Sequence, residues 1–506
     1  MTVDAEKAAV KTYDYIIVGG GTAGCPLAAT LSQNYSVLVL ERGDSPYGNP
    51  DIEEAKLFGK PFSETNKYTS IAQGFVSEDG VQLLRARVLG GATAINAGFY
   101  SRASLEYIRN MRWDEKLVNQ SYEWVEKQNA FKPNRLSHWS STFQNALMEA
   151  KVLPYNGYTV DHVEGTKISA STFDNNGKRH TAADLLKSAN PQNIVLLLNV
   201  TASRILFHSG SGKPKVYGVE FMSANNGMSY KASLNKLSGR NEVILSAGSL
   251  GSPQLLLLSG IGPSKHLKQF NIPVLLDLPL VGKGVQDNPG TIMSVESPIP
   301  LESSSIQVVA ILNDSQVYIE SASPVQQVPV NGTSGATRTQ YTGRIFEKLA
   351  FPKSRGELRL QSRDPRDNPS VRYNYFSHPH DLPTCMQAVK VIAKLSETAS
   401  VQNFTFKNMS SGAREFKFVG QAIPQSTSGD EVVAKFCHDA LVTVWHFHGG
   451  CHIGSVINRR HKVKGVRGLR IVDGSTFEDC PGTNPQATTM MLGRYTGLKI
   501  LEERSR

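Results

Sequence analysis

The chain has 506 residues, of which 40% are hydrophobic and 19% are charged. This composition excludes a disordered or fibrous protein and provides enough apolar surface for two or three domains. The formal net charge is +10, but the lysines and arginines are scattered, and the densest basic run, 459–464, contains no aromatic residue. We therefore expect no nucleic acid partner.

No stretch of the sequence approaches the ~18 apolar residues that a membrane-spanning helix needs, so we predict no transmembrane segment. The first residues lack the basic and apolar regions of a signal peptide. Seven Asn-x-Ser/Thr acceptors for N-glycosylation nevertheless favour a secreted glycoprotein or one of the secretory pathway. They are Asn34, Asn119, Asn199, Asn313, Asn331, Asn403 and Asn408.

The five cysteines are too few and too dispersed for a disulfide scaffold, although their number allows one bridge. No Cys-x-x-Cys pair indicates a zinc or redox site. His446 and His448 lie two residues apart without a third ligand at a recognised spacing, and two glycines before His452 indicate a turn. We predict no metal site.

The N-terminal segment 13–41 carries the clearest local structure. Tyr13–Val18 is an apolar, β-branched run typical of a buried strand, a helix is expected at Ala23–Gln33, and Val37–Leu40 predicts a second buried strand. Together these elements form a β-α-β unit.

Four later apolar runs, separated by Ser, Gly and Lys turns, resemble a meander of strands beside this unit. They are Ile194–Leu198, Arg204–Phe207, Val216–Met222 and Glu242–Ser246. The segment Ser303–Gln340 is rich in Ser, Val, Gln and Gly, and we expect strands and loops over a substrate cavity there. Helices are expected at Leu382–Glu397 and Thr488–Leu501.

A glycine motif follows the first predicted strand. Gly19-x-Gly21-x-x-Gly24 lets the backbone turn tightly and approach a pyrophosphate, which then lies at the positive end of the following helix. Glu41 ends the second strand, where a carboxylate accepts hydrogen bonds from ribose hydroxyls. The segment therefore predicts a dinucleotide site and leaves NAD and FAD open.

Two further blocks, Ala86–Asn96 and Gly248–Gly262, resemble the two signatures of the glucose-methanol-choline (GMC) oxidoreductase family. Ala92 departs from the residues usual in the first signature, and the second fits at every fixed position. Trp445–Cys451, Val472–Ser475 and Gly482–Ala487 resemble the catalytic end of the family. The similarity runs from Tyr13 to about Glu502 and is nearest to the plant branch, with its HOTHEAD-like and mandelonitrile lyase-like members.

The resemblance implies FAD as the cofactor and an α/β fold: an FAD-binding Rossmann-like domain and a second α+β substrate domain built on an antiparallel sheet. The implied FAD domain is discontinuous (10–105, 190–290 and 437–506), and the substrate domain comprises 106–189 and 291–436. The residues expected to bind FAD are Gly19, Gly21, Thr22, Ala23, Gly24, Glu41, Arg42, Val88, Ala92, Asn96, Ala97, Gly98, Phe99, Ala202, Trp445, His446, Gly474, Pro485 and Gln486.

His446 and Asn484 are the expected catalytic residues. Oxidation of an alcohol by hydride transfer needs a base for the hydroxyl proton and a donor that holds the oxygen. An imidazole accepts a proton near neutral pH, and an amide group donates a hydrogen bond. The helix predicted after Asn484 would stabilise negative charge on the reduced flavin through its positive end.

The expected function is FAD-dependent oxidation of a small-molecule alcohol to an aldehyde or ketone. The alternative is a hydroxynitrile (mandelonitrile) lyase, which keeps the flavin but cleaves a cyanohydrin without redox turnover. Resemblance to the lyases places Asn484, Val444 and Glu320 where those enzymes have a second histidine, a tyrosine and a cysteine, which favours oxidation. Val444 and Glu320 are expected to contact the substrate. A flavin-bound protein without turnover is a third hypothesis, against which intact His446 and Asn484 argue.

The resemblance to the almond-type lyases also implies a disulfide between Cys385 and Cys437. Cys25 and Cys451 lie within motifs and are expected to be free packing residues. The identity of the alcohol, the electron acceptor and the oligomeric state do not follow from the sequence.

Overall fold

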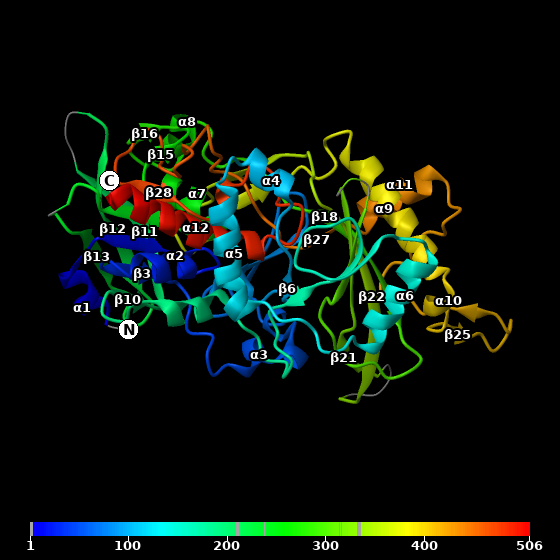
Figure 1. Ribbon diagram of the computed structural model, residues 1–506. Helices are drawn as coiled ribbons and strands as arrows, with labels where there is room; N and C mark the ends of the chain where they lie inside the picture. The colour runs from blue at the N-terminus through cyan, green and yellow to red at the C-terminus, as the bar shows by residue number, and fades with distance from the viewer. Residues whose placement is uncertain are drawn as a thin grey trace.

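The computed structural model describes residues 4–208, 212–236, 238–312, 314, 316–330 and 335–505. One part of the molecule is built on a parallel sheet with helices, and the other on a large, mainly antiparallel sheet with its own helices (Figure 1). Both chain ends lie in the first part. The expected α/β fold with a second sheet-based part is confirmed.

The parallel sheet has the strand order β10-β3-β2-β14-β28, and every neighbouring pair is parallel. Its strands are β2 (Tyr15–Val18), β3 (Val37–Leu40), β10 (Ile194–Leu197), β14 (Glu242–Leu245) and β28 (Leu469–Ile471). Side chains alternate across it, so Ile16 packs in the core shared with the meander and Ile17 in the core shared with the helices.

The predicted β-α-β unit is present with small changes at its ends. β3 has the predicted bounds, and the helix α2 is Gly24–Leu31. The first predicted strand is divided after Tyr13, because β1 (Thr12–Tyr13) pairs with the meander whereas β2 enters the parallel sheet.

The predicted meander is partly wrong. β11 (Val200–His208), β12 (Lys215–Ser223) and β13 (Ser229–Leu234) form the antiparallel meander, with β1 at its edge. The runs that became β10 and β14 instead join the parallel sheet. Both are buried along almost their whole length, as strands covered on two faces are.

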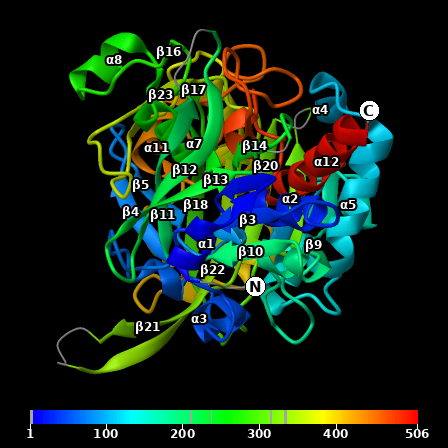
Figure 2. The same ribbon diagram turned by 90° about the vertical axis from the view of Figure 1, so that its left-hand side faces the viewer.

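The large sheet has the order β27-β18-β22-β20-β19-β8-β7, and β21 pairs with one end of β22. Its pairs are antiparallel except for the parallel edge pair β7-β8. Helices α6 (His138–Glu149) and α9 (Asp381–Ser396) pack in one core with it, and α9 matches the predicted helix at 382–397. The β21-β22 hairpin extends away from the body (Figure 2). The strands are β7 (Tyr155–Tyr158), β8 (Gly165–Ile168), β18 (Pro289–Glu296), β19 (Val308–Leu312), β20 (Val317–Ala322), β21 (Val325–Pro329), β22 (Thr337–Leu349) and β27 (Val442–Thr443).

The C-terminal helix α12 (Gln486–Ser505) packs against α2 and against α5 (Glu115–Asn129). Gly493 permits the close crossing with the N-terminal segment, because a Cβ atom there would lie 2.2 Å from the carbonyl oxygen of Ala23. α5 thus belongs to the core of α2 and α12, although residues 106–189 were assigned to the substrate domain. The domain boundaries stay a prediction.

The remaining elements are short connections and covering helices, and no helix among the described residues is long and apolar enough to cross a membrane. The helices are α1 (Ala5–Val10), α3 (Pro50–Glu53), α4 (Leu105–Asn110), α7 (Gly248–Leu258), α8 (Ser264–Gln269), α10 (Ala399–Gln402) and α11 (Asp430–Asp439). The strands are β4 (Ala72–Val76), β5 (Gln82–Ala86), β6 (Phe99–Tyr100), β9 (Ala170–Ser171), β15 (Ile261–Gly262), β16 (Leu276–Asp277), β17 (Lys283–Val285), β23 (Gly356–Arg359), β24 (Ser370–Arg372), β25 (Phe406–Lys407) and β26 (Arg414–Glu415).

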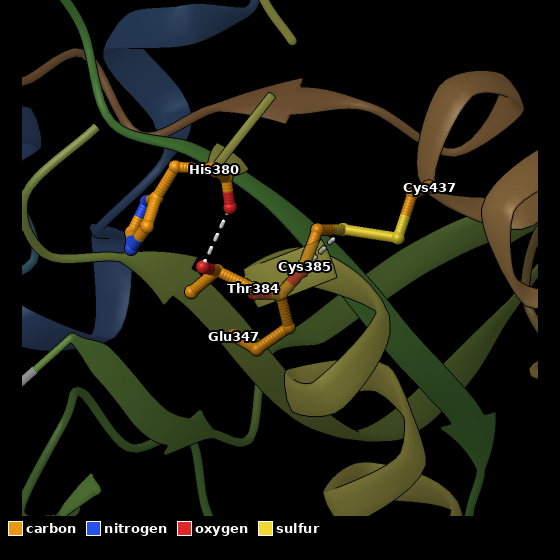
Figure 3. Close-up of a disulfide and its surroundings, with 5 residues drawn as sticks. All are labelled: Glu347, His380, Thr384, Cys385 and Cys437. Carbon is orange, nitrogen blue, oxygen red and sulfur yellow. Dashed lines mark hydrogen bonds between the residues drawn. A yellow bond between two sulfur atoms is a disulfide. The ribbon is translucent and has the colours of Figure 1, made fainter. Parts of the chain in front are cut away.

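A disulfide joins Cys385 of α9 to Cys437 of α11, which confirms the implied pairing (Figure 3). The other three cysteines are free and buried. Cys385 Sγ lies 3.6 Å from Oε1 of Glu347, a buried residue of β22. Burial raises the pKa of Glu347 to about 8. The bridge ties α11 to α9, and α9 packs against β22.

We predict that replacing Cys385 and Cys437 together by serine lowers the free energy of unfolding by about 4 kcal/mol, since the bridge closes a loop of 52 residues. Denaturant unfolding of the oxidised protein measures this difference. Cys451→Ser, which changes a buried thiol outside any bridge, is the control. A loss no larger than that of the control, or free alkylation of both thiols in the native protein, would contradict the prediction.

Candidate active site

One large cavity of about 1570 Å³ contains nearly all of the predicted site residues. Its walls come from the glycine-rich loop, from α7, from the large sheet and from the C-terminal segment. Every residue predicted to bind FAD, to react or to contact the substrate lines it, with the exception of Gly24. Gly24 lies behind the loop, where a Cβ atom would come 1.9 Å from the carbonyl oxygen of Gly19. Its role is therefore to let the loop pack.

The glycine-rich loop connects β2 to α2 and opens toward the cavity. Gly19 has a φ of +102°, and a Cβ atom there would lie 2.3 Å from the carbonyl oxygen of Ser246. A Cβ atom on Gly21 would instead meet nothing nearer than the Cα of Gly91, at 3.7 Å. The middle glycine thus exposes its backbone to the cavity beside the first turn of α2.

Glu41 follows β3 and fixes the loop. Its two carboxylate oxygens accept the backbone N–H groups of Gly20 and Gly43, each at 2.8 Å. Burial raises the pKa of this carboxyl group. Each oxygen keeps capacity for a further hydrogen bond, so Glu41 can still accept from a ribose hydroxyl in the cavity.

The loop 96–99 is joined directly to the beginning of α12. Asn96 Nδ2 donates to Gln486 Oε1 at 2.8 Å, and its Oδ1 accepts the N–H of Gly98 at 2.9 Å. Gln486 Nε2 donates in turn to the carbonyl oxygen of Phe99. Segments almost 400 residues apart in the sequence thereby form one wall of the cavity.

His446 is held through its backbone. Its N–H donates to Asp287 Oδ1 at 2.9 Å, and the hydroxyl groups of Thr443 and Tyr375 donate to the other carboxylate oxygen. Burial raises the pKa of Asp287 to about 6. Trp445, immediately before the histidine, has a φ of +58°, an unusual conformation for a residue with a side chain. Asp287 was not identified from the sequence, where it carries no motif.

The imidazole of His446 is buried, and its Nδ1 has no hydrogen-bond partner in the described part of the chain. Burial lowers the pKa of His446 well below its usual value, and nearby Lys348 and His448 lower it further. The ring is therefore neutral at pH 7 and available to accept a proton.

Asn484 meets a buried ion pair that the sequence reasoning missed. Lys348 Nζ donates to Asn484 Oδ1 and, at 2.7 Å, to Glu320 Oε1. The side chains of Lys348 and Glu320 are only 2% and 5% exposed. Lys348 also lies over the ring of Tyr318, 5.0 Å from its centroid. Glu320, predicted as a substrate contact, thus lines the cavity as the partner of a buried cation.

The cavity fits the flavin dinucleotide that the resemblance implies. Gly21 leaves room for a pyrophosphate at the start of α2, and Glu41 has capacity for ribose hydroxyls. No group of three or more His, Cys, Asp or Glu side chains among the described residues could hold a metal ion.

Comparison with known proteins gives the same family along most of the chain. The N-terminal model of the GMC oxidoreductases matches residues 13–290, and the C-terminal model matches residues 352–493. The "(R)-mandelonitrile lyase-like" protein of Arabidopsis thaliana is 47% identical over 98% of this chain and 90% of its own length. The "Sinalpyl alcohol oxidase Nec3" of Nesocodon mauritianus is 44% identical over 97% of this chain and 89% of its own length.

Among solved structures, a formate oxidase superposes with a TM-score of 0.80 at 19% identity, covering 98% of this chain and 99% of that protein. This likeness shows the shared fold. The two family models and the relatives at more than 40% identity show the family itself. The chain belongs to the GMC oxidoreductase family, whose members are FAD-dependent enzymes, and its cofactor is FAD.

Proposed function

We propose that this enzyme oxidises an alcohol to an aldehyde or ketone, with His446 as the base and Asn484 as the donor that holds the reacting oxygen. When bound, FAD supplies the acceptor for the hydride that leaves the alcohol carbon. Burial keeps the His446 ring neutral. Its Nδ1 is enclosed by protein atoms, so the hydroxyl proton is assigned to Nε2.

The contact between Lys348 and Asn484 is the observation that carries the proposal. Because Lys348 Nζ donates to the amide oxygen, that oxygen is engaged and the Nδ2 group remains free to donate. Lys348 is itself fixed by Glu320. The pair therefore orients Asn484 as a donor toward an alcohol or alkoxide oxygen.

The lyase alternative is supported by His446 and by relatives named mandelonitrile lyases, which are 38–41% identical. Cleavage of a cyanohydrin needs a positive field that holds cyanide and a group that moves its proton. Here Oε1 of Glu320 lies 2.7 Å from Nζ of Lys348 and compensates its charge, and the amide of Asn484 does not titrate. These features favour oxidation.

The proposal places the enzyme in an oxidising compartment, either outside the cell or within the secretory pathway. The disulfide between Cys385 and Cys437 is typical of such compartments. Asn34, Asn119 and Asn403, three of the N-glycosylation acceptors, are exposed. Two other acceptors, at positions 313 and 331, lie outside the described residues.

The reaction class is tested by mixing the FAD-loaded enzyme anaerobically with a panel of alcohols while the flavin absorbance is followed. We expect at least one alcohol to bleach the flavin, since a hydride acceptor becomes reduced. Mandelonitrile is assayed in parallel for benzaldehyde release. An unbleached flavin together with rapid benzaldehyde release would establish the lyase and overturn the proposal.

We predict that His446→Ala lowers kcat at least ~100-fold while FAD stays bound, because the proton acceptor is lost. Stopped-flow flavin reduction measures the chemical step, and the flavin spectrum of the purified variant measures cofactor content. His461→Ala, at a buried histidine that lies outside the cavity lining, is the control for loss of an imidazole. Flavin reduction at the wild-type rate would remove His446 from the mechanism.

We predict that the double variant Lys348→Met with Glu320→Gln still folds and binds FAD, because both members of the buried pair are replaced together. The amide of Asn484 then loses its orienting donor, and kcat should fall at least ~10-fold with a smaller change in KM. Steady-state kinetics and thermal unfolding check the two parts. Unchanged kcat in a folded variant would show that the pair does not orient Asn484.

A further inference from the structure

A second basic residue of β22 faces the same cavity. Residues on a strand alternate between its faces, so Arg344, Phe346 and Lys348 share one face. Arg344 and Phe346 line the cavity, and Lys348 reaches Asn484 there. The opposite face packs elsewhere, since Glu347 meets Cys385. The guanidinium group of Arg344 therefore belongs to the wall of the cavity.

Arg344 makes no side-chain hydrogen bond or ion pair with the described residues, and its Nε is buried without a partner. Its cross-strand neighbours are Ser294 on β18 and Ala322 on β20, neither of them charged. Burial lowers its pKa, with no acidic group opposing the shift. Only its backbone is fixed, because Trp139 Nε1 donates to its carbonyl oxygen at 3.1 Å.

The three acidic residues of the cavity are all engaged elsewhere. Glu41 accepts from the backbone of the glycine-rich loop, and Glu320 pairs with Lys348. Asp473 accepts from the N–H of Gly248 and from hydroxyl groups beside it. The Nε of Arg344 is buried without a partner, although the residue as a whole is partly exposed, so a counter-charge that the protein lacks is expected to come from a ligand.

The spacing along β22 (Thr337–Leu349) separates Arg344 from Lys348 and so from the reaction centre. Lys348 lies four residue steps further along the strand, so the two Cα atoms are about 13 Å apart. Between them lies an apolar row in which Phe346 pairs with Ile292, and both line the cavity. From the reaction centre outward, the wall thus offers Asn484, then an apolar stretch, then a cation.

The geometry points to a substrate in which an apolar spacer separates the reacting hydroxyl group from a carboxylate, and Arg344 binds that carboxylate. This inference rests on the proposed oxidation and names its substrate class. A guanidinium matches a carboxylate through two parallel N–H···O bonds. The same site discriminates against alcohols of equal length that lack the charge, because they leave the guanidinium unpaired.

The test compares ω-hydroxydecanoic acid with n-decanol as substrates of the FAD-loaded enzyme. The measured quantity is the ratio of their kcat/KM values. We expect Arg344→Gln to lower this ratio about 10- to 100-fold, chiefly through the KM of the acid, since one charge-assisted contact is lost. Arg344→Lys, which keeps the positive charge but not the paired N–H donors of the guanidinium, should lower this ratio less. Arg135→Gln, at an exposed arginine outside the cavity lining, is the control and should leave it unchanged.

The outcomes separate this inference from the proposed function. If wild type and Arg344→Gln oxidise both compounds with the same ratio, the carboxylate site is wrong and the oxidation stands. If neither compound reduces the flavin, the wider alcohol panel tests the oxidation. The role of Arg344 is then tested by the binding of decanoate. In that case decanoate should perturb the flavin spectrum of the wild type at about 10-fold or more lower concentration than that of Arg344→Gln. Equal binding would overturn the inference.

Discussion

The arrangement of the active site depends on the need to compensate one buried cation. Lys348 is enclosed by protein, and an unpaired ammonium group in such a place would cost several kcal/mol. Glu320 compensates it from the neighbouring strand, and Asn484 accepts a further hydrogen bond from the beginning of α12. The contact therefore joins the large sheet to the flavin-binding part at the place where the substrate must react.

The N-terminal half of the flavin site could be predicted because its signals are local. A buried strand, three glycines and a carboxylate after the next strand lie within some thirty residues, and each is required by the backbone close to it. β3 accordingly has its predicted bounds, and Gly19 and Glu41 lie where the motif places them. His446 and Asn484 were found through family motifs, which encode a distant arrangement in short segments.

The remaining residues could not be predicted because their neighbours are far away in the sequence. β10 and β14 look like any short apolar run, and only the packing of helices and meander on their two faces assigns them to the parallel sheet. In the same way, 337–349 shows no regular alternation, since it begins with four polar residues and ends with an apolar pair, a charged pair and Leu349. The fold turns the face with Arg344, Phe346 and Lys348 toward the cavity, so the two basic residues become visible as site residues only in three dimensions.

One face of β22 therefore packs in the protein core, and the other faces the active-site cavity. Gly343, Ile345 and Glu347 meet the helices and the disulfide, and Trp139 packs so closely that a Cβ atom on Gly343 would lie 2.5 Å from its ring. Because the opposite residues are carried by the same backbone, tight packing at the back fixes where Arg344 and Lys348 point. Packing in the core and the position of the two basic side chains are therefore linked, because side chains along β22 alternate between the core and the cavity.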